Sequence, residues 1–144
     1  MDLFICLLQL VVHIGAHEEY HHIKLEQQSF GRGYCGYDID GCVPSNNVCT
    51  TCSNPVLCTS IDCKGIASQV SRDLNFKDLK ITASDDPGRY LCAYSFYLSL
   101  SFDATRSIFI HVPPFDSNCT LEMVTAVVQK IIAAILDTLD ASKD

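Results

Sequence analysis

Two side chains in the second half of the chain could carry out nucleophilic chemistry together: Cys92, in the run GRYLC, and His111, in the run FIHVPP. A thiol can attack a carbonyl carbon, and an imidazole within hydrogen-bond reach of the thiol can take its proton. On their own, a cysteine and a histidine this far apart in a sequence are more often a buried thiol and a buried histidine whose hydrogen bonds are made within the core. The pair therefore predicts a cysteine-type hydrolase only if the fold brings both side chains to one crevice.

The sequence around Cys92 predicts a buried helix that begins just before it. The run DDPG at residues 85–88 offers acidic cap candidates and a Pro-Gly turn, and apolar or aromatic residues then surround the helix from 89 to about 100. In the first turn, unpaired backbone N–H groups and the positive end of the helix dipole favour a thiolate and can hold an oxyanion. Residues 107–112 indicate a short buried strand, with His111 at its exit.

The order of the remaining apolar segments indicates an α/β fold. Their lengths and periodicities predict four further elements: a strand at 7–14, a helix at 61–74, a strand at 79–83 and a helix at 121–139. Gly15 is expected to end the first strand. This order predicts a three-layer α/β/α sandwich with a mostly parallel sheet, in a single domain of residues 1–144. In such a sheet the carboxyl ends of strands and the amino ends of helices gather at one edge, where Cys92 and His111 could meet.

The motifs GRYLC and FIHVPP resemble those of the pyroglutamyl-peptidase I family of cysteine peptidases. In that family the Cys of the first motif is the nucleophile and the His of the second is its partner, so the resemblance implies these roles for Cys92 and His111. A third family residue is a Glu in a V-x-L-E-like context after a buried strand. Here LVVHIG resembles the strand and IKLE resembles the Glu segment, which implies that Glu26 orients His111. The likeness extends from about residue 10 to residue 139.

The resemblance also implies a function: removal of an amino-terminal pyroglutamate from peptide substrates, without a cofactor. Family members begin with another third of chain that includes a strand and a pocket-shaping aromatic loop, so the chain is expected to be truncated at its amino-terminal side. Ala93 and Pro87 replace the residues that are usual in the family beside the nucleophile. These departures leave an alternative open, a catalytically weak or non-catalytic paralogue or splice form that acts as a binding module.

The run HEEYH at residues 17–21 fits the H-E-x-x-H pattern, which on a helix places two zinc ligands beside a general base. It offers a second alternative, a zinc peptidase that uses His17, Glu18 and His21. Such an enzyme also needs a long enough helix and a third ligand downstream. We therefore expect the run to be a polar, partly solvated connection in which His17 matters little for catalysis.

Residues 29–63 are rich in Gly, Asn, Ser, Pro and Cys, so they are expected to form one long Cys-rich loop. Cys49 and Cys52 form a C-x-x-C pair, but the nearby cysteines lack the spacing of a second pair, so no metal site is predicted. The chain has nine cysteines, an odd number, and a core of this size needs no disulfides. Because the apolar start of the chain also carries the acidic Asp2 and no cleavage-site pattern, we expect a cytoplasmic protein with reduced thiols.

The composition argues against two classes of partner. The formal net charge is −7 and the ten Lys and Arg residues are scattered, so no basic stripe is available for nucleic-acid phosphates. No apolar run reaches the roughly 18 to 20 residues of a membrane span. The resemblance instead implies peptides with an amino-terminal pyroglutamate as partners, and the sequence gives no oligomeric state.

Overall fold

A four-stranded sheet forms the centre of the computed structural model, which describes residues 10–142. Its strands are β1 (Val11–Ala16), β2 (His22–Glu26), β5 (Lys80–Ser84) and β6 (Ser107–Val112), in the order β1-β6-β2-β5. β1 runs parallel to β6, and β2 runs parallel to β5, while β2 and β6 are antiparallel. The sheet is mixed and mostly parallel, as the sequence predicted.

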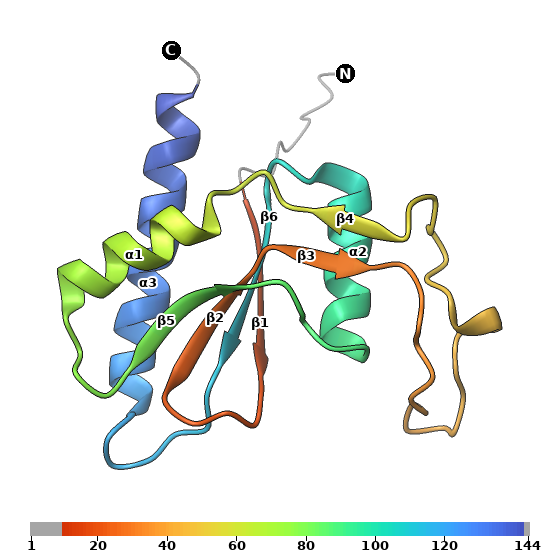
Figure 1. Cartoon of the computed structure of the whole chain (residues 1–144), viewed down its shortest axis with the longest axis horizontal. Helices are drawn as coiled ribbons and strands as arrows, with labels where there is room; N and C mark the ends of the chain where they lie inside the picture. Colours follow the sequence, from red (N-terminus) through yellow and green to blue (C-terminus); the bar gives the residue numbers. More distant parts are fainter. Residues whose placement is uncertain (1–9, 143–144) are drawn as a thin grey trace, which may run out of the picture.

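Helices cover both faces of this sheet and give the molecule three layers (Figure 1). α1 (Cys63–Leu74) and α3 (Leu121–Ala141) lie against each other on one face, and α2 (Leu91–Asp103) lies on the other face against β1 and β6. The main core fills the space between the sheet and the α1–α3 layer. Its fully buried side chains include Ile23, Leu25, Val70, Ile108, Ile110, Val127 and Ile131. The three-layer α/β/α sandwich is therefore confirmed.

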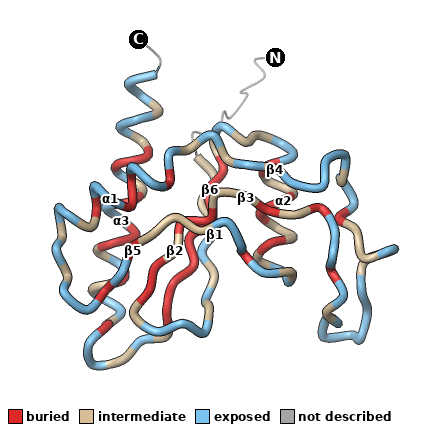
Figure 2. Tube along the Cα trace, viewed as in Figure 1, coloured by how far each residue is buried: buried red, intermediate tan, exposed pale blue. Residues whose placement is uncertain are grey.

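β6 is an inner strand and is buried along its whole length (Figure 2). Its sequence, SIFIHV, is the continuous apolar run expected of a strand that is covered on both faces. Ile108 and Ile110 belong to the core beneath α1 and α3, whereas Phe109 packs under α2. Because side chains alternate along a strand, His111 shares the α2 face with Phe109.

The two helices of the main core begin with side-chain caps. Thr120 accepts a hydrogen bond from the Met123 backbone N–H at 3.2 Å and starts α3, and Asp62 accepts one from Gly65 N–H at 3.0 Å and starts α1. Neither these helices nor α2, nor any other helix among residues 10–142, combines the length and apolar character needed to cross a membrane.

β1 differs in its bounds from the predicted strand. We expected a strand at 7–14 that Gly15 ends, but β1 runs through Gly15 to Ala16. Residues 7–9 lie outside the described part of the chain. Gly15 is paired with His111 in the β1–β6 register, so it is an interior strand residue rather than a stop. Glycine occupies this position because a side chain here would collide with its neighbours.

The prediction of one loop over 29–63 was wrong at both ends of that segment. β3 (Gln28–Phe30) and β4 (Val56–Cys58) pair as antiparallel strands and form a small second sheet, and a short 3-10 turn, η1 (Ser45–Asn47), lies between them. Strands of three residues carry too little alternation to be detected in a sequence.

The segment between β3 and β4 packs on α2. Tyr34 and Cys49 are buried in one apolar cluster with Ala93 and Tyr97 of that helix, and the Tyr97 hydroxyl donates a hydrogen bond to the Asn54 carbonyl at 2.5 Å. The four-stranded sheet therefore covers one side of α2, and the Cys-rich segment covers another side. All eight cysteines among the described residues are free thiols.

Candidate active site

Glu26 and His111 form a buried hydrogen-bonded pair. His111 Nδ1 donates to Glu26 Oε1 at 2.7 Å, and Glu26 is fully buried. In the antiparallel β2–β6 register Glu26 lies opposite Phe109, so Glu26 and His111 are diagonal neighbours on one face of the sheet. Because a carboxylate can only accept, the bond assigns the proton to Nδ1 and leaves Nε2 of the neutral ring as an acceptor.

Cys92 reaches the same face from the first turn of α2. A Cβ at Gly15 would lie 2.8 Å from Cys92 Sγ and 2.8 Å from the Phe109 ring. Gly15 is the strand neighbour of His111, and the Phe109 and His111 ring centroids are 4.7 Å apart. Gly15 and Phe109 thus place Cys92 beside the Glu26–His111 pair. Within the described residues, Cys92 and His111 have no direct hydrogen bond.

The surroundings of Cys92 keep its thiol protonated at rest. Burial raises the pKa of the Cys92 thiol, and the charge of Glu26 raises it further, while a hydrogen bond from the Cys92 backbone N–H lowers it. The sequence predicted that the start of the helix would favour a thiolate, but the cost of desolvating a charged sulfur is larger here. A base must therefore remove the proton during attack.

The amino end of α2 offers backbone donors beside the Cys92 sulfur. Tyr90, the cap residue, makes no side-chain capping bond, and the first intrahelical bond runs from Tyr94 N–H to the Tyr90 carbonyl at 3.0 Å. The N–H groups of Leu91, Cys92 and Ala93 therefore precede the helical ladder. At the positive end of the helix dipole, such groups can hold an oxyanion.

The turn before α2 fixes where the helix begins. Gly88 has φ 81°, a conformation that favours glycine. Asp86 Oδ1 accepts hydrogen bonds from the Gly88 N–H and from Arg89 Nη1, each at 3.0 Å. The Arg89 guanidinium lies 3.4 Å from the centroid of the Phe30 ring and so ties this turn to β3. The GR of the GRYLC motif therefore has a structural role in positioning Cys92.

The zinc alternative for residues 17–21 is not supported. These residues form the connection between β1 and β2 and contain no helix, so the i, i+4 geometry of H-E-x-x-H is missing. His21 has φ 54° and its Nε2 pairs with Asp116 Oδ2 at 2.6 Å, whereas His17 Nε2 donates to the His22 carbonyl at 2.7 Å. Among residues 10–142, no group of three or more His, Cys, Asp and Glu side chains could hold a metal ion.

His17 is a neighbour of the site that the sequence did not predict. Its ring centroid lies 5.7 Å from that of His111, with the ring planes at 73°. The sequence offered His17 only as a zinc ligand or as part of a polar connection. The signal that could have identified it is its place directly after β1, but this signal requires knowing that β1 pairs with β6.

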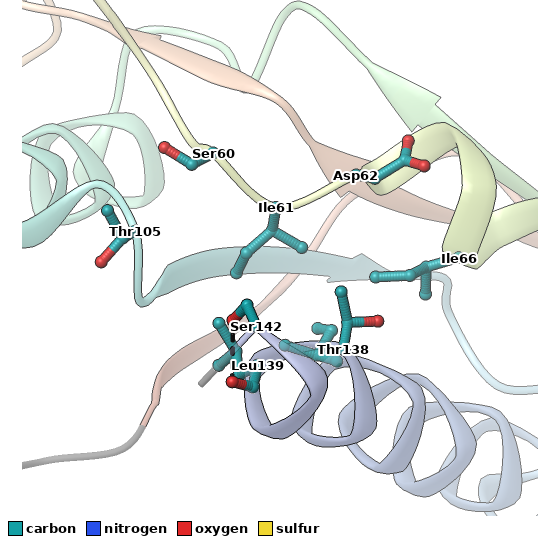
Figure 3. Close-up of a pocket in the computed structure, with 9 residues that line it drawn as sticks. Ser60, Ile61, Asp62, Ile66, Thr105, Thr138, Leu139 and Ser142 are labelled. Atoms are coloured by element: carbon teal, nitrogen blue, oxygen red, sulfur yellow. Dashed lines mark hydrogen bonds between the residues drawn. The ribbon is translucent and has the colours of Figure 1, made fainter. Parts of the chain in front are cut away.

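A separate pocket of about 280 Å³ lies between the start of α1 and the end of α3 (Figure 3). Its walls are mostly apolar and include Ile61, Ile66, Ile135 and Leu139 together with the hydroxyl-bearing Thr105 and Thr138. None of Glu26, Cys92 and His111 lines it, so it is distinct from the candidate active site.

Comparison with known sequences identifies a family. Residues 1–116 match PgaPase_1, the model of a family of pyroglutamyl peptidases. The chain is 32% identical to human pyroglutamyl-peptidase 1 over 135 residues, which cover 94% of this chain and 64% of that protein. It is 31% identical to human pyroglutamyl-peptidase 1-like protein, again over 94% of this chain and over 67% of the relative. The chain thus spans about two thirds of the length of these relatives.

Comparison with solved structures supports the same fold. The pyrrolidone carboxyl peptidase of Thermococcus litoralis superposes with a TM-score of 0.74 at 19% sequence identity, over 94% of this chain and 69% of that chain. Because the family model matches residues 1–116 and a human relative is 31% identical over 67% of its own length, the chain belongs to the pyroglutamyl-peptidase family.

Proposed function

We propose that this protein is a cysteine peptidase that removes an amino-terminal pyroglutamate from peptides, with Cys92 as nucleophile, His111 as base and Glu26 as the residue that orients His111. The observation that supports this most strongly is the buried Glu26–His111 hydrogen bond, with Cys92 held beside it by Gly15. The names of the relatives supply the substrate class.

The reaction begins with transfer of a proton. Because the Cys92 thiol is protonated at rest, His111 Nε2 takes its proton as the sulfur attacks the carbonyl carbon of the pyroglutamyl residue. The ring then carries a positive charge, and Glu26 Oε1 stabilises it through the hydrogen bond to Nδ1. The adjacent N–H groups at the start of α2 would stabilise the oxyanion, an interaction worth about 3 kcal/mol of barrier where single donors have been removed from other enzymes.

The second half of the reaction releases both products. His111 gives its proton to the leaving amine, the amide bond breaks and the pyroglutamyl group stays on Cys92 as a thioester. Water then loses a proton to His111 and attacks this thioester, which releases pyroglutamate and returns the thiol. Every proton and bond in this cycle is accounted for by residues of the site and water, so no cofactor is invoked.

The decisive experiment is turnover of a fluorogenic pyroglutamyl amide by the purified chain. We expect Cys92→Ala and His111→Ala to abolish turnover, and Glu26→Gln to leave a measurable remainder about 10²- to 10⁴-fold below the unmodified protein. Turnover that persists in Cys92→Ala would refute the thiol mechanism. A chain that binds the pyroglutamyl amide without hydrolysing it would instead support the non-catalytic binding module.

We also propose that the protein resides in the cytoplasm and acts there on peptides. The free thiols of the described residues are consistent with a reducing compartment, where disulfides rarely persist. Cell fractionation with an antibody to the chain tests this location, and recovery in a secreted fraction would contradict it.

A further inference from the structure

The orientation of His111 depends on more than its hydrogen bond. The bond from Nδ1 to Glu26 fixes one atom of the ring, but the ring could still pivot about it. Two other rings limit this movement. The Phe109 ring centroid lies 4.7 Å from that of His111, with the ring planes tilted by 47°. The His17 ring centroid lies 5.7 Å from that of His111, in a T-shaped arrangement. Pairs at these separations are in attractive contact and have a preferred geometry.

His17 is itself held firmly. Its backbone N–H donates to the Val112 carbonyl at 3.1 Å, which ties it to the end of β6. Its ring Nδ1 accepts the Glu19 backbone N–H at 3.2 Å, and its Nε2 donates to the His22 carbonyl at 2.7 Å. Both ring nitrogens are therefore engaged, which assigns a neutral ring with its proton on Nε2.

A hydrogen-bonded network supports the turn that carries His17. The Glu19 carboxylate bonds to Lys24 Nζ at 2.5 Å and to His22 Nδ1 at 2.7 Å, and His22 Nε2 bonds to Thr82 Oγ1 at 2.7 Å. The turn is thus anchored to β2 and β5. Because these contacts already fix the turn, the His17 ring against His111 is an additional feature that turn formation does not require.

The electrostatic surroundings suit this arrangement. Burial lowers the pKa of His17, the nearby charges of Lys24 and His111 lower it further, and the bond to the His22 carbonyl and the charge of Glu19 act the other way. A neutral His17 puts no second positive charge beside His111 when that ring becomes an imidazolium.

We propose that His17 is a positioning residue that holds the His111 imidazole in the orientation from which Nε2 takes the Cys92 proton. The inference rests on the proposed function insofar as His111 is the base of Cys92. Small errors in the placement of a reacting group cost large factors in rate, so a residue that stops a base from pivoting affects the chemical step more than substrate binding.

The test uses three substitutions at the same place in the fold. His17→Gln offers an acceptor for the Glu19 N–H and a donor for the His22 carbonyl but has no ring, so it separates the ring contact from the turn. His17→Phe restores a ring without the two bonds. His21→Asn is the matched control, since His21 belongs to the same turn, pairs with Asp116 and has a φ that Asn tolerates.

Two measurements are made on each protein. The first is kcat and KM on a pyroglutamyl amide. The second is the rate at which iodoacetamide alkylates Cys92 near neutral pH, which peptide mapping measures. The rate in His111→Ala gives the lower limit for this reaction. The exposed thiols Cys35, Cys42 and Cys58 report in the same sample whether the reagent or the fold has changed.

For His17→Gln we expect kcat to fall about tenfold while KM stays within about twofold, a loss of about 1.4 kcal/mol of transition-state stabilisation. Cys92 alkylation should slow toward the His111→Ala rate, with unchanged rates at the exposed thiols. His17→Phe should recover part of both losses, and His21→Asn should behave like the unmodified protein.

The inference is overturned if His17→Gln matches the unmodified protein, if His17→Phe is no better than His17→Gln, or if His21→Asn shows the same loss. Failure of the proposed function gives a different result. If the amide is not hydrolysed but Cys92 alkylation still depends on both His111 and His17, the positioning role stands without the peptidase activity.

Discussion

At the residue scale, Glu26 bonds to His111 through only one carboxylate oxygen. The other, Oε2, is buried without a hydrogen-bond partner among the described residues. Burying a carboxylate in this way costs free energy, and the bond from His111 offsets only part of it. We therefore interpret Glu26 as a residue whose role is to hold His111 rather than to stabilise the fold.

This asymmetry predicts unequal effects on stability. His111→Ala leaves the buried carboxylate with no partner and should lower the free energy of unfolding by about 3 kcal/mol or more. Glu26→Gln removes the charge and should cost clearly less. The double variant should recover part of the His111→Ala loss, because its remaining group is neutral. Urea unfolding of the three variants measures these differences, and equal losses in His111→Ala and in the double variant would contradict the interpretation.

Glu19 should make the stability of the β1–β2 turn depend on acidity. Hydrogen bonds from Lys24 and then His22 lower the pKa of Glu19 from 4.5 to about 2. A carboxyl group whose pKa is lower in the folded than in the unfolded chain contributes stability above the unfolded pKa, and this contribution is lost as the pH falls from 4.5 toward 2.

We therefore expect Glu19→Gln to lower the urea midpoint near neutral pH and to have a shrinking effect as the pH falls through that window. The exposed neighbour Glu18 provides the matched control, and Glu18→Gln should show no such change. If the difference in urea midpoint between Glu19→Gln and the unmodified protein stays constant from neutral to acid pH, the ion pair is not what Glu19 contributes to stability.

At the element scale, Gly15 lets strand β1 and helix α2 approach each other at the site. A Cβ at this position would meet Cys92 Sγ and the Phe109 ring, each at 2.8 Å. Gly15→Ala should therefore displace the nucleophile, lower kcat at least about tenfold and destabilise the fold by about 1 to 3 kcal/mol. Ala16→Ser, at an exposed position of the same strand, is the control. Unchanged kcat in Gly15→Ala would mean that Cys92 Sγ need not occupy its present position.

Local patterns predicted most of the elements because their signals lie within single segments. β6 is a continuous apolar run, α2 follows a Pro-Gly turn, and α3 repeats apolar residues at helical spacing after Thr120. The motifs around Cys92 and His111 were specific enough to nominate both residues. Patterns of this kind depend only on neighbours in the sequence, so the expected bounds differ from the observed ones by a few residues at most.

The parts that were missed depend on contacts between distant segments. Gly15 looked like the end of a strand, because the space taken by Cys92 and Phe109 is not visible from its neighbours in the sequence. The antiparallel pairing of β2 with β6, which brings Glu26 diagonally to His111, does not follow from the parallel-sheet rule that predicted the shared edge. The contact of His17 with His111 was hidden for the same reason.

At the scale of the whole molecule, the chain spans 64% of human pyroglutamyl-peptidase 1, and β1 is an edge of the described sheet. An edge strand leaves backbone groups available for pairing with another strand. We expect the 144-residue polypeptide to hydrolyse a pyroglutamyl amide with kcat/KM at least about tenfold below that of the same chain joined to the part of the human relative that it does not match. This factor corresponds to about 1.4 kcal/mol of transition-state binding.

Both polypeptides should be compared as monomers isolated by size-exclusion chromatography, with Cys92→Ala of each as the blank. Equal kcat/KM values would show that the 144 residues complete the substrate site by themselves.

The position of β6 between β1 and β2 also determines when the site can exist during folding. β1 (Val11–Ala16) and β6 (Ser107–Val112) are far apart in the sequence, so their pairing closes a long loop. Helices form in microseconds or less, whereas strand pairing over such separations is slow. Because Gly15, Cys92 and His111 become neighbours only through this pairing, we expect His111-dependent reactivity of Cys92 to arise after the helical circular-dichroism signal in a refolding experiment. A partly folded chain would then carry its helices but no working nucleophile, and peptide cleavage would begin only with the last long-range pairing of the sheet.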